Sequence, residues 1–175
     1  MIWLAPSAVV TGDVTIGDET SVWHHATLRG DTEAIVIGRQ TNIQDNVVVH
    51  VDEGAPCRIG NRVVVGHGAI VHGCTVDDEV TIGMGAIITT GAHIGEQSFI
   101  GAGAVVSEGT KIPPRSIALG VPAKVHHLLQ PHHLERIRHG WRNYLELAEA
   151  QLPKFPPLQG DAAKRVRTSA QRAPR

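Results

Sequence analysis

Three histidines that lie close behind aliphatic residues are the positions in this sequence where residue type and spacing point most directly to chemistry. His50 and His72 each directly follow a valine, and His67 comes shortly after another. Three imidazole ligands with a fourth position left open are the arrangement of a catalytic zinc site, and imidazole also suits Fe²⁺ and Co²⁺. Whether the three side chains can meet depends on the elements that carry them.

Those elements are set by an aliphatic residue that recurs about every six positions over most of the chain. The series is Val10, Ile16, Val22, Leu28, Ile37, Ile43, Val49, Ile59, Val65, Val71, Val76, Ile82, Ile88, Ile94, Ile100, Val106 and Ile112. An amphipathic helix has a period of 3.6, whereas a sustained hexad repeat is typical of a parallel β-helix. Each hexad then forms one short strand and a corner, and three hexads complete a triangular coil with the aliphatic residues inside.

Counting hexads places the three histidines at two corners of the prism. His50 and His72 are one coil apart, so we expect them to stack at one corner with their backbones ~4.8 Å apart. His67 belongs to a neighbouring corner and should not converge with them within one chain. Three prisms around a three-fold axis would bring His67 of one chain to the other two histidines of the next. The alternative is that all three are ordinary surface residues.

Two interruptions of the repeat flank the histidines, at residues 29–35 and 51–58. Insertions in a solenoid form loops, often on the binding face. The first interruption is expected to place Arg29 and Asp31 at a corner, where Arg29 holds an anionic product or pairs with Asp31. Gln44 also follows an aliphatic residue directly, so it is expected to point outward and hydrogen-bond a metal-bound water. The alternative is that polar residues here only form turns.

We expect three segments along the chain. Residues 1–125 form the β-helix, residues 126–152 form a helix that begins near Pro131, and residues 153–175 are disordered. The helix should pack one apolar face on a prism: Leu134, Ile137, Trp141, Leu145, Ala148 and Leu152. Four histidines around the helix start are interpreted as structural or solvated: His126, His127, His132 and His133.

Charge and cysteine content limit the classes of function. Residues 1–152 carry ten Lys and Arg against sixteen Asp and Glu, whereas residues 153–175 carry six against one. The acidic body argues against nucleic acid as a partner. The sequence contains no run of eighteen apolar residues and no recognisable signal peptide, so no membrane association is expected. Two cysteines fit a reducing cytoplasm, with Cys74 expected in the core and Cys57 exposed in a loop.

Beyond these patterns, three motifs in the chain resemble those of the gamma-class carbonic anhydrases, over roughly residues 5–150. The motifs are Ser21-Val-Trp…Leu28-Arg-Gly-Asp31, Asn42-Ile-Gln-Asp-Asn46…His50, and His67-Gly-Ala-Ile-Val-His72-Gly-Cys. The match is closest to the bacterial branch that includes proteins of phenylacetate and carnitine pathways.

The resemblance implies a left-handed parallel β-helix with a C-terminal α-helix, assembled as a homotrimer with metal at each subunit interface. It also implies that His50, His67 and His72 bind Zn²⁺, and that the site hydrates CO₂ to bicarbonate. Further residues are implied around the metal: Gln44, Arg29, Asp31 and, from the helix, Tyr144.

Other functions remain open because a fold does not determine a function. A hexapeptide-repeat acyltransferase or thioesterase acting on acyl-CoA is one alternative, and a non-catalytic metal-binding trimer is another. The chain also departs from the founding pattern of the family, since Thr32 stands where that pattern has Glu. Glu53, three residues after His50, lies where a proton-shuttle Glu would fall, in a much shorter loop.

Overall fold

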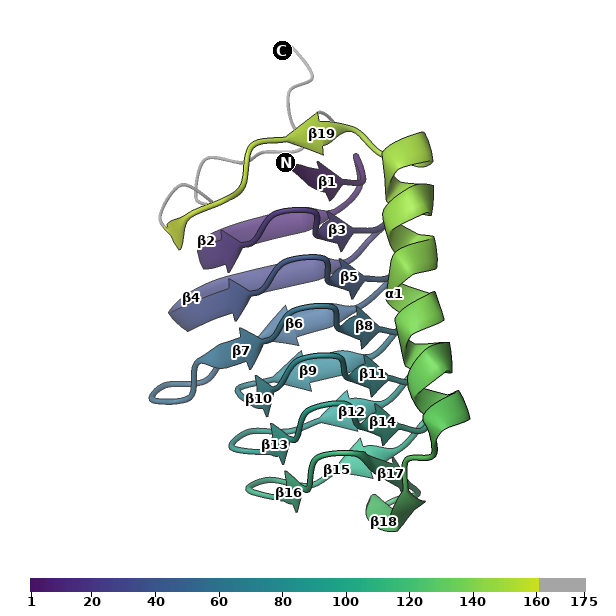
Figure 1. Ribbon diagram of the computed structural model, residues 1–175. Coiled ribbons are helices and arrows are strands. Elements are labelled where there is room, and N and C mark those ends of the chain that lie inside the picture. Colours follow the sequence, from purple (N-terminus) through teal and green to yellow (C-terminus); the bar gives the residue numbers. More distant parts are fainter. Residues whose placement is uncertain (161–175) are drawn as a thin grey trace, which may run out of the picture.

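The hexad repeat folds into a triangular prism of short, mostly parallel strands, with one long helix along its side (Figure 1). The computed structural model describes residues 1–160. Successive aliphatic residues of the repeat lie on successive faces, so each face gains one strand per coil. The expected parallel β-helix with a C-terminal α-helix is confirmed.

One face, here called the helix face, is a nine-stranded sheet that contacts the helix. Its parallel strands are β1 (Ile2–Leu4), β3 (Ser21–Val22), β5 (Asn42–Ile43), β8 (Val64–Val65), β11 (Thr81–Ile82), β14 (Phe99–Ile100) and β17 (Ser116–Leu119). Two antiparallel strands cover its ends, with β19 (Lys154–Phe155) beside β1 and β18 (Lys124–Leu128) beside β17. Covering these edges removes unpaired backbone groups that would invite association.

The other two faces belong to one ten-stranded sheet that bends along β2 (Val9–Ile16) and β4 (Thr27–Ile37). The first half of β4 pairs with β6 and the second half with β7. The ladder face continues through β6 (Val48–His50), β9 (Ile70–His72), β12 (Ile87–Ile88) and β15 (Val105–Val106). The outer face continues through β7 (Cys57–Ile59), β10 (Thr75–Val76), β13 (His93–Ile94) and β16 (Lys111–Ile112).

The segment around Arg29 differs from the loop-like corner that the sequence predicts. Strand β4 runs through it in register with β2, apart from a shift between Gly12 and Val14 of β2. Glycine allows this close approach, because a Cβ on Gly12, whose φ is +82°, would lie 2.0 Å from the carbonyl oxygen of Gly30. Strand pairing therefore positions Arg29 directly beside β6.

Branched aliphatic side chains stacked from coil to coil fill the prism, and isoleucine dominates the largest of them. Cys74 is buried, as predicted. The prediction for Cys57 was wrong, because β7 turns this residue inward and leaves it 0% exposed. A hydrogen bond with Cys57, together with burial, raises the pKa of the Cys74 thiol. These thiols are packing groups, since a reactive cysteine needs an accessible thiolate.

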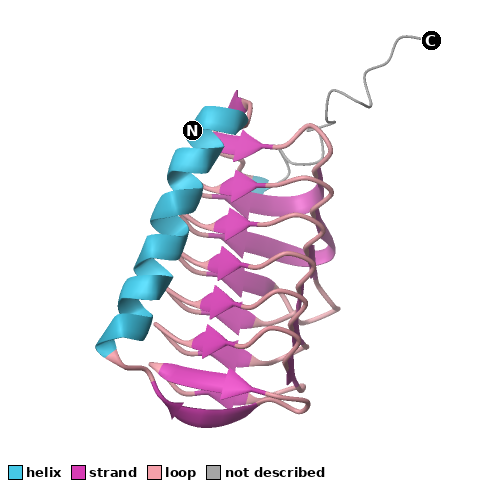
Figure 2. Cartoon of the chain, turned by 90° about the vertical axis from the view of Figure 1, so that its right-hand side faces the viewer, coloured by secondary structure: helices cyan, strands magenta, loops and turns pink. Residues whose placement is uncertain are grey.

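The C-terminal helix α1 (Pro131–Gln151) lies along the helix face (Figure 2). Its expected apolar face is confirmed: Ile137, Ala148 and Leu152 are buried, and the other members are partly buried. The buried carboxylate of Glu79 holds the helix to the prism, with Oε2 lying 3.4 Å from a terminal nitrogen of Arg138. Within the described residues, no helix has the length and apolar character that crossing a membrane requires.

Residues 153–160 correct the expectation of disorder from residue 153 onward. Strand β19 pairs with β1, and Leu158 bridges to Ile16 and is 7% exposed. The apolar side chain of Leu158 covers the N-terminal end of the core. The composition of residues 153–160 does not reveal that the segment is ordered by this contact. The rest of the expected tail, residues 161–175, lies outside the described residues. The expected boundary between residues 125 and 126 also falls inside β18.

Replacing Ile137 by Ala should lower the free energy of unfolding by about 2–5 kcal/mol, because it leaves a cavity between α1 and the prism. Urea denaturation followed by circular dichroism measures this loss. Val121→Ala is the matched control, since Val121 is 72% exposed and should change stability by less than about 0.5 kcal/mol. Equal effects of the two substitutions would mean that the helix is peripheral.

Candidate metal centre

His50 and His72 lie side by side because β6 and β9 pair in register. The pairing aligns Arg29 with His50, and His50 with His72, in one column at the corner between the ladder face and the outer face. Side chains alternate across a strand, so residues that follow an inward aliphatic residue point outward. Nδ1 of His50 lies 3.1 Å from Nε2 of His72. The predicted stacking of these two histidines is confirmed.

The remaining nitrogen of each ring is hydrogen-bonded to an oxygen. Nε2 of His50 lies 3.0 Å from Oδ1 of Asp31, and Nδ1 of His72 lies 3.0 Å from Oγ1 of Thr90. Arg29 forms an ion pair with Asp31. Desolvation opposes the charge on Asp31, but hydrogen bonds with His50 and Arg29 outweigh it and lower the pKa of the carboxyl. Asp31 is therefore an ionised acceptor near neutral pH.

His67 lies at the opposite edge of the ladder face, in the corner after β8. Its Nδ1 is 2.9 Å from Oδ2 of Asp45, and its Nε2 is 3.3 Å from the hydroxyl of Tyr144 on α1. Tyr144 packs edge-on against Trp23, with 5.4 Å between ring centroids. As expected, His67 does not join the other two histidines within one chain. Across residues 1–160, no group of three His, Cys, Asp or Glu side chains could hold a metal ion.

Gln44 points outward from the prism, as the sequence predicts, but it lies under α1 and supports the backbone of His67. It is 4% exposed, and its Oε1 accepts a hydrogen bond of 3.1 Å from the His67 N–H. Its Nε2 donates to Oδ1 of Asn42 at 3.1 Å. A backbone N–H can only donate, so these two bonds determine which side-chain amide atom is the oxygen and which is the nitrogen in Gln44 and Asn42. Gln44 therefore holds the His67 corner in place.

The three histidines share one arrangement, in which an oxygen engages one ring nitrogen and leaves the other for a further ligand or hydrogen bond. Metal-binding histidines usually have such an orienting partner. The 3.1 Å between Nδ1 of His50 and Nε2 of His72 is close to the edge of a zinc tetrahedron, roughly 3.3 Å for bonds of 2.0–2.1 Å. The donor set at this corner therefore fits two of the ligands of a metal ion.

Sequence reasoning left Thr90 out of the site. The available signal was spacing, because Thr90 follows His72 by 18 residues, a single coil of the prism. From its sequence position, Asp45 is either a turn former or a partner for a histidine. Coil stacking brings its Oδ2 to 2.9 Å from Nδ1 of His67, which favours the second role.

An outward apolar row crosses the ladder face between the two histidine corners. Strand pairing aligns its members: Val9, Thr27, Val48, Ile70, Ile87 and Val105. Val9, Val48 and Ile70 are each 37% exposed. The corresponding row on the outer face is mostly polar: Thr15, Val36, Arg58, Thr75, His93 and Lys111. Contiguous exposed apolar side chains mark an interaction surface, so the ladder face is the face suited to a partner.

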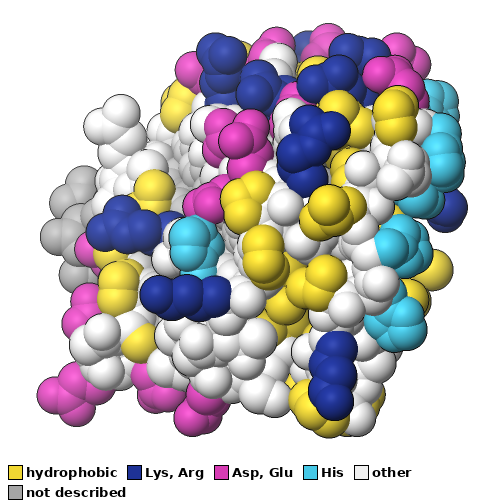
Figure 3. All heavy atoms as spheres, turned by 60° about the horizontal axis from the view of Figure 1, so that its bottom comes forward, with side chains coloured by type: hydrophobic (Ala, Val, Ile, Leu, Met, Phe, Trp, Pro, Cys, Tyr) yellow, Lys and Arg dark blue, Asp and Glu magenta, His cyan; other side chains and the backbone are white. Residues whose placement is uncertain are grey.

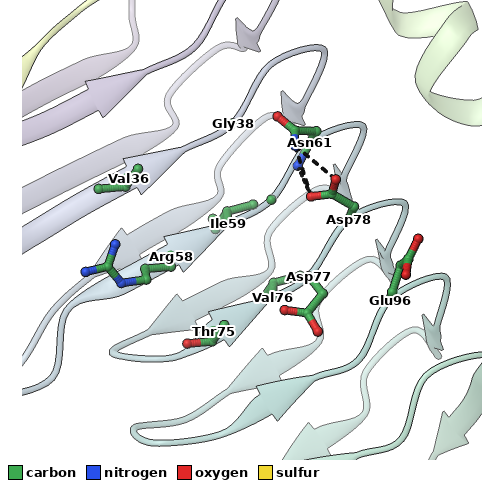
Figure 4. Close-up of a pocket in the computed structure, with 11 residues that line it drawn as sticks. Val36, Gly38, Arg58, Ile59, Asn61, Thr75, Val76, Asp77, Asp78 and Glu96 are labelled. Carbon is green, nitrogen blue, oxygen red and sulfur yellow. Dashed lines mark hydrogen bonds between the residues drawn. The ribbon is translucent and has the colours of Figure 1, made fainter.

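A cavity of about 470 Å³ on the outer face has acidic residues around it (Figure 4). Asp78 accepts hydrogen bonds from the backbone N–H and the amide of Asn61, at 2.8 and 2.9 Å. Asp77 lies 2.8 Å from Nε2 of His93. Because both carboxylates bind residues of neighbouring coils, we assign them to the stability of the outer face.

Comparison with known proteins agrees with this geometry. The model of the bacterial transferase hexapeptide family (six repeats) matches residues 73–108. A probable carbonic anhydrase of Methanocaldococcus jannaschii is 47% identical over 146 residues, which are 83% of this chain and 92% of that protein. The mitochondrial gamma carbonic anhydrase 2 of Arabidopsis thaliana is 40% identical over 154 residues, and the chain spans about half of its length (85% and 55% covered).

A solved structure from Bacillus cereus, provisionally described as an acetyltransferase, superposes with a TM-score of 0.84. It is 39% identical in sequence, with 85% of this chain and 87% of that chain covered. The repeat, the prism and the histidine corners define a hexapeptide-repeat protein. Within that class, the identity to the archaeal and plant relatives shows that the chain belongs to the gamma-class carbonic anhydrase family.

The Tyr144 phenol should titrate above its ordinary value of 10. Burial, and then the negative charge of Asp45, raise its pKa, so the neutral hydroxyl remains a hydrogen-bond donor. Tyr144 is the one tyrosine in the chain, and absorbance at 295 nm therefore reports it alone. Asp45→Asn should lower the midpoint, because it removes the charge that disfavours the phenolate.

Asp77→Asn is the control for that titration, since Asp77 lies on the outer face and should leave the midpoint unchanged. Circular dichroism at each pH verifies that the protein stays folded. A wild-type midpoint at or below 10, or an unchanged midpoint in Asp45→Asn, would contradict the described contact between α1 and the His67 corner.

Proposed function

We propose that this chain is a zinc-dependent carbonic anhydrase that reversibly hydrates CO₂ to bicarbonate. It works as a homotrimer, in which His50 and His72 of one protomer and His67 of the next hold each metal ion. The observation that carries the proposal is the 3.1 Å separation between the ring nitrogens of His50 and His72, with His67 at the far edge of the same face. The relatives described as carbonic anhydrases support it.

The ladder face supports the trimer. Its apolar row lies between the corner of His67 and the corner of His50 and His72. Packing this row against a neighbouring prism would bury it and bring the two kinds of corner together. A closed ring repeats the same interface three times, and so completes three equivalent sites.

A zinc ion held by three imidazoles would lower the pKa of a water molecule bound to it to about 7. It would thereby supply a hydroxide nucleophile near neutral pH. The chain's own residues prepare the site. Asp31, Thr90 and Asp45 each engage one histidine ring, which orients the ring and selects its tautomer.

Two further side chains are suited to the reactants. Tyr144 keeps its proton, and its hydroxyl lies beside Nε2 of His67. From there it can donate a hydrogen bond to an oxygen of CO₂ or bicarbonate. Arg29, paired with Asp31, adds a cation that favours the bicarbonate anion. Glu53 is exposed in the loop after His50 and can exchange protons with water.

The same three imidazoles also suit Fe²⁺ and Co²⁺ as the bound metal ion. The two free thiols fit a location in the reducing cytoplasm.

An acyltransferase or thioesterase acting on acyl-CoA is the second candidate. The likeness to the Bacillus cereus structure supports it. Acyl transfer or thioester hydrolysis does not require three histidines that each have an orienting partner. The three oriented histidines therefore favour the carbonic anhydrase function. Acyl-CoA turnover by metal-free protein would reverse the preference, and bound metal without any turnover would favour a non-catalytic metal-binding trimer.

Protein purified without oxygen should contain about one metal ion per chain and hydrate CO₂. His67→Ala should lose the metal and reduce hydration by at least about 100-fold, since even orienting partners of ligands contribute 10–100-fold. Elemental analysis and stopped-flow measurement with a pH indicator test both points. His93→Ala is the matched control, because that histidine pairs with Asp77 on the outer face. Equal hydration rates in wild type and His67→Ala would reject the proposal.

Mixing two inactive variants tests whether each site is shared between chains. His67→Ala and His50→Ala chains are unfolded together and reassembled. An interface with one chain of each kind can then combine His50 and His72 of the first with His67 of the second. Metal binding should partly return in mixed trimers, although neither variant binds alone. Absence of recovery, despite proven mixed assembly, would mean that each site lies within one chain.

A further inference from the structure

A groove of about 370 Å³ lies between the first half of α1 and the helix face. Strands β8, β11 and β14 form one side, and residues 136–140 of α1 form the other. Most of its lining is apolar, and the accessible apolar side chains include Met84, Phe99 and Ala102. Its volume lies within the ~300–1,000 Å³ typical of sites for small molecules.

Near one end of the groove the helix lies close to the prism. A Cβ on Gly140 would lie 3.6 Å from a methyl group of Val64, which is ordinary van der Waals contact. Gln44 also lines the groove. Because Gln44 binds the backbone of His67, the groove lies directly behind the His67 corner.

At the other end the groove continues toward the start of α1. A second cavity of about 210 Å³ shares Phe99 and Arg136 with the groove and is also lined by Ile117. The two cavities together extend from β8 to β17, three steps between neighbouring strands and therefore roughly 14 Å. This shape, long and apolar along its middle, matches an extended hydrocarbon chain.

The outer end carries positive and titratable groups. Arg136, His127 and His133 line the second cavity, with 5.9 Å between the two imidazole centroids. Desolvation and the nearby charges of His132, His127 and Arg136 lower the pKa of His133. None of the ion pairs formed within residues 1–160 includes Arg136. Histidines gather along the side of the molecule where α1 lies (Figure 3). An anion at this end would offset the repulsion between these groups.

We propose that the groove binds a medium-chain aliphatic carboxylate, with the carboxylate at Arg136 and the chain along Phe99 and Met84 toward Val64. Arg136 selects an anionic head group, the two imidazoles can donate hydrogen bonds to it, and the apolar middle selects an unbranched chain. The bound chain lies beside Gln44, and so behind the backbone of His67. Binding requires neither the metal nor turnover, and it therefore stands apart from the proposed function.

Isothermal titration of the full, metal-free chain with decanoate, kept below the concentration at which it forms micelles, tests the proposal. One decanoate should bind per chain. Thr81→Phe places a ring in the groove and should abolish binding. Thr75→Phe is the matched control, since Thr75 holds the same strand position on the outer face and lines the cavity there. Arg136→Ala should weaken binding about tenfold, which corresponds to about 1.4 kcal/mol.

Two further ligands identify the head group. Decanol should bind at least about tenfold more weakly than decanoate, because it lacks the charge that Arg136 recognises. Decanoyl-CoA should not compete with decanoate. Equal binding of decanol and decanoate, binding of decanoyl-CoA alone, or unchanged binding by Thr81→Phe would each overturn the proposal. Arg136 is exposed, so its variant remains informative if Thr81→Phe fails to fold.

Discussion

In-register stacking of parallel strands is the constraint on which every other feature of this protein depends. Inward aliphatic side chains align each coil on the next, and a shift by one residue would turn them all outward. The same alignment brings residues from distant parts of the sequence into contact. His50 meets His72 across 22 residues, and His72 meets Thr90 across 18. The prism therefore converts sequence spacing into the geometry of a site.

The stacking also explains why the candidate centre is incomplete in one chain. Columns of side chains run along the prism, but a column at one corner cannot reach the next corner. His67 is therefore held at one edge of the ladder face while His50 and His72 share the other. The apolar row between them makes the same face suitable for a partner. Assembly and metal binding would then depend on one surface.

The helix joins this arrangement through few contacts. Glu79 and Ile137 hold it to the prism, and Tyr144 extends from it to His67. From the helix face of the prism, Gln44 accepts a hydrogen bond from the backbone N–H of the same histidine. The His67 corner is consequently supported by two side chains, and one of them, Gln44, also lines the groove. Changes in the position of α1 would act on the candidate centre first through this corner.

The sequence by itself determined the parallel β-helix, the helix from Pro131 and the stacking of His50 on His72, because period and register follow from local spacing. It misjudged Cys57 and residues 153–160, since their burial depends on contacts with other coils or with the end of the prism. Tertiary structure alone decided which oxygen orients each imidazole and where α1 leaves a groove. Those features depend on side-chain directions and on the separation of packed elements, which no sequence period encodes.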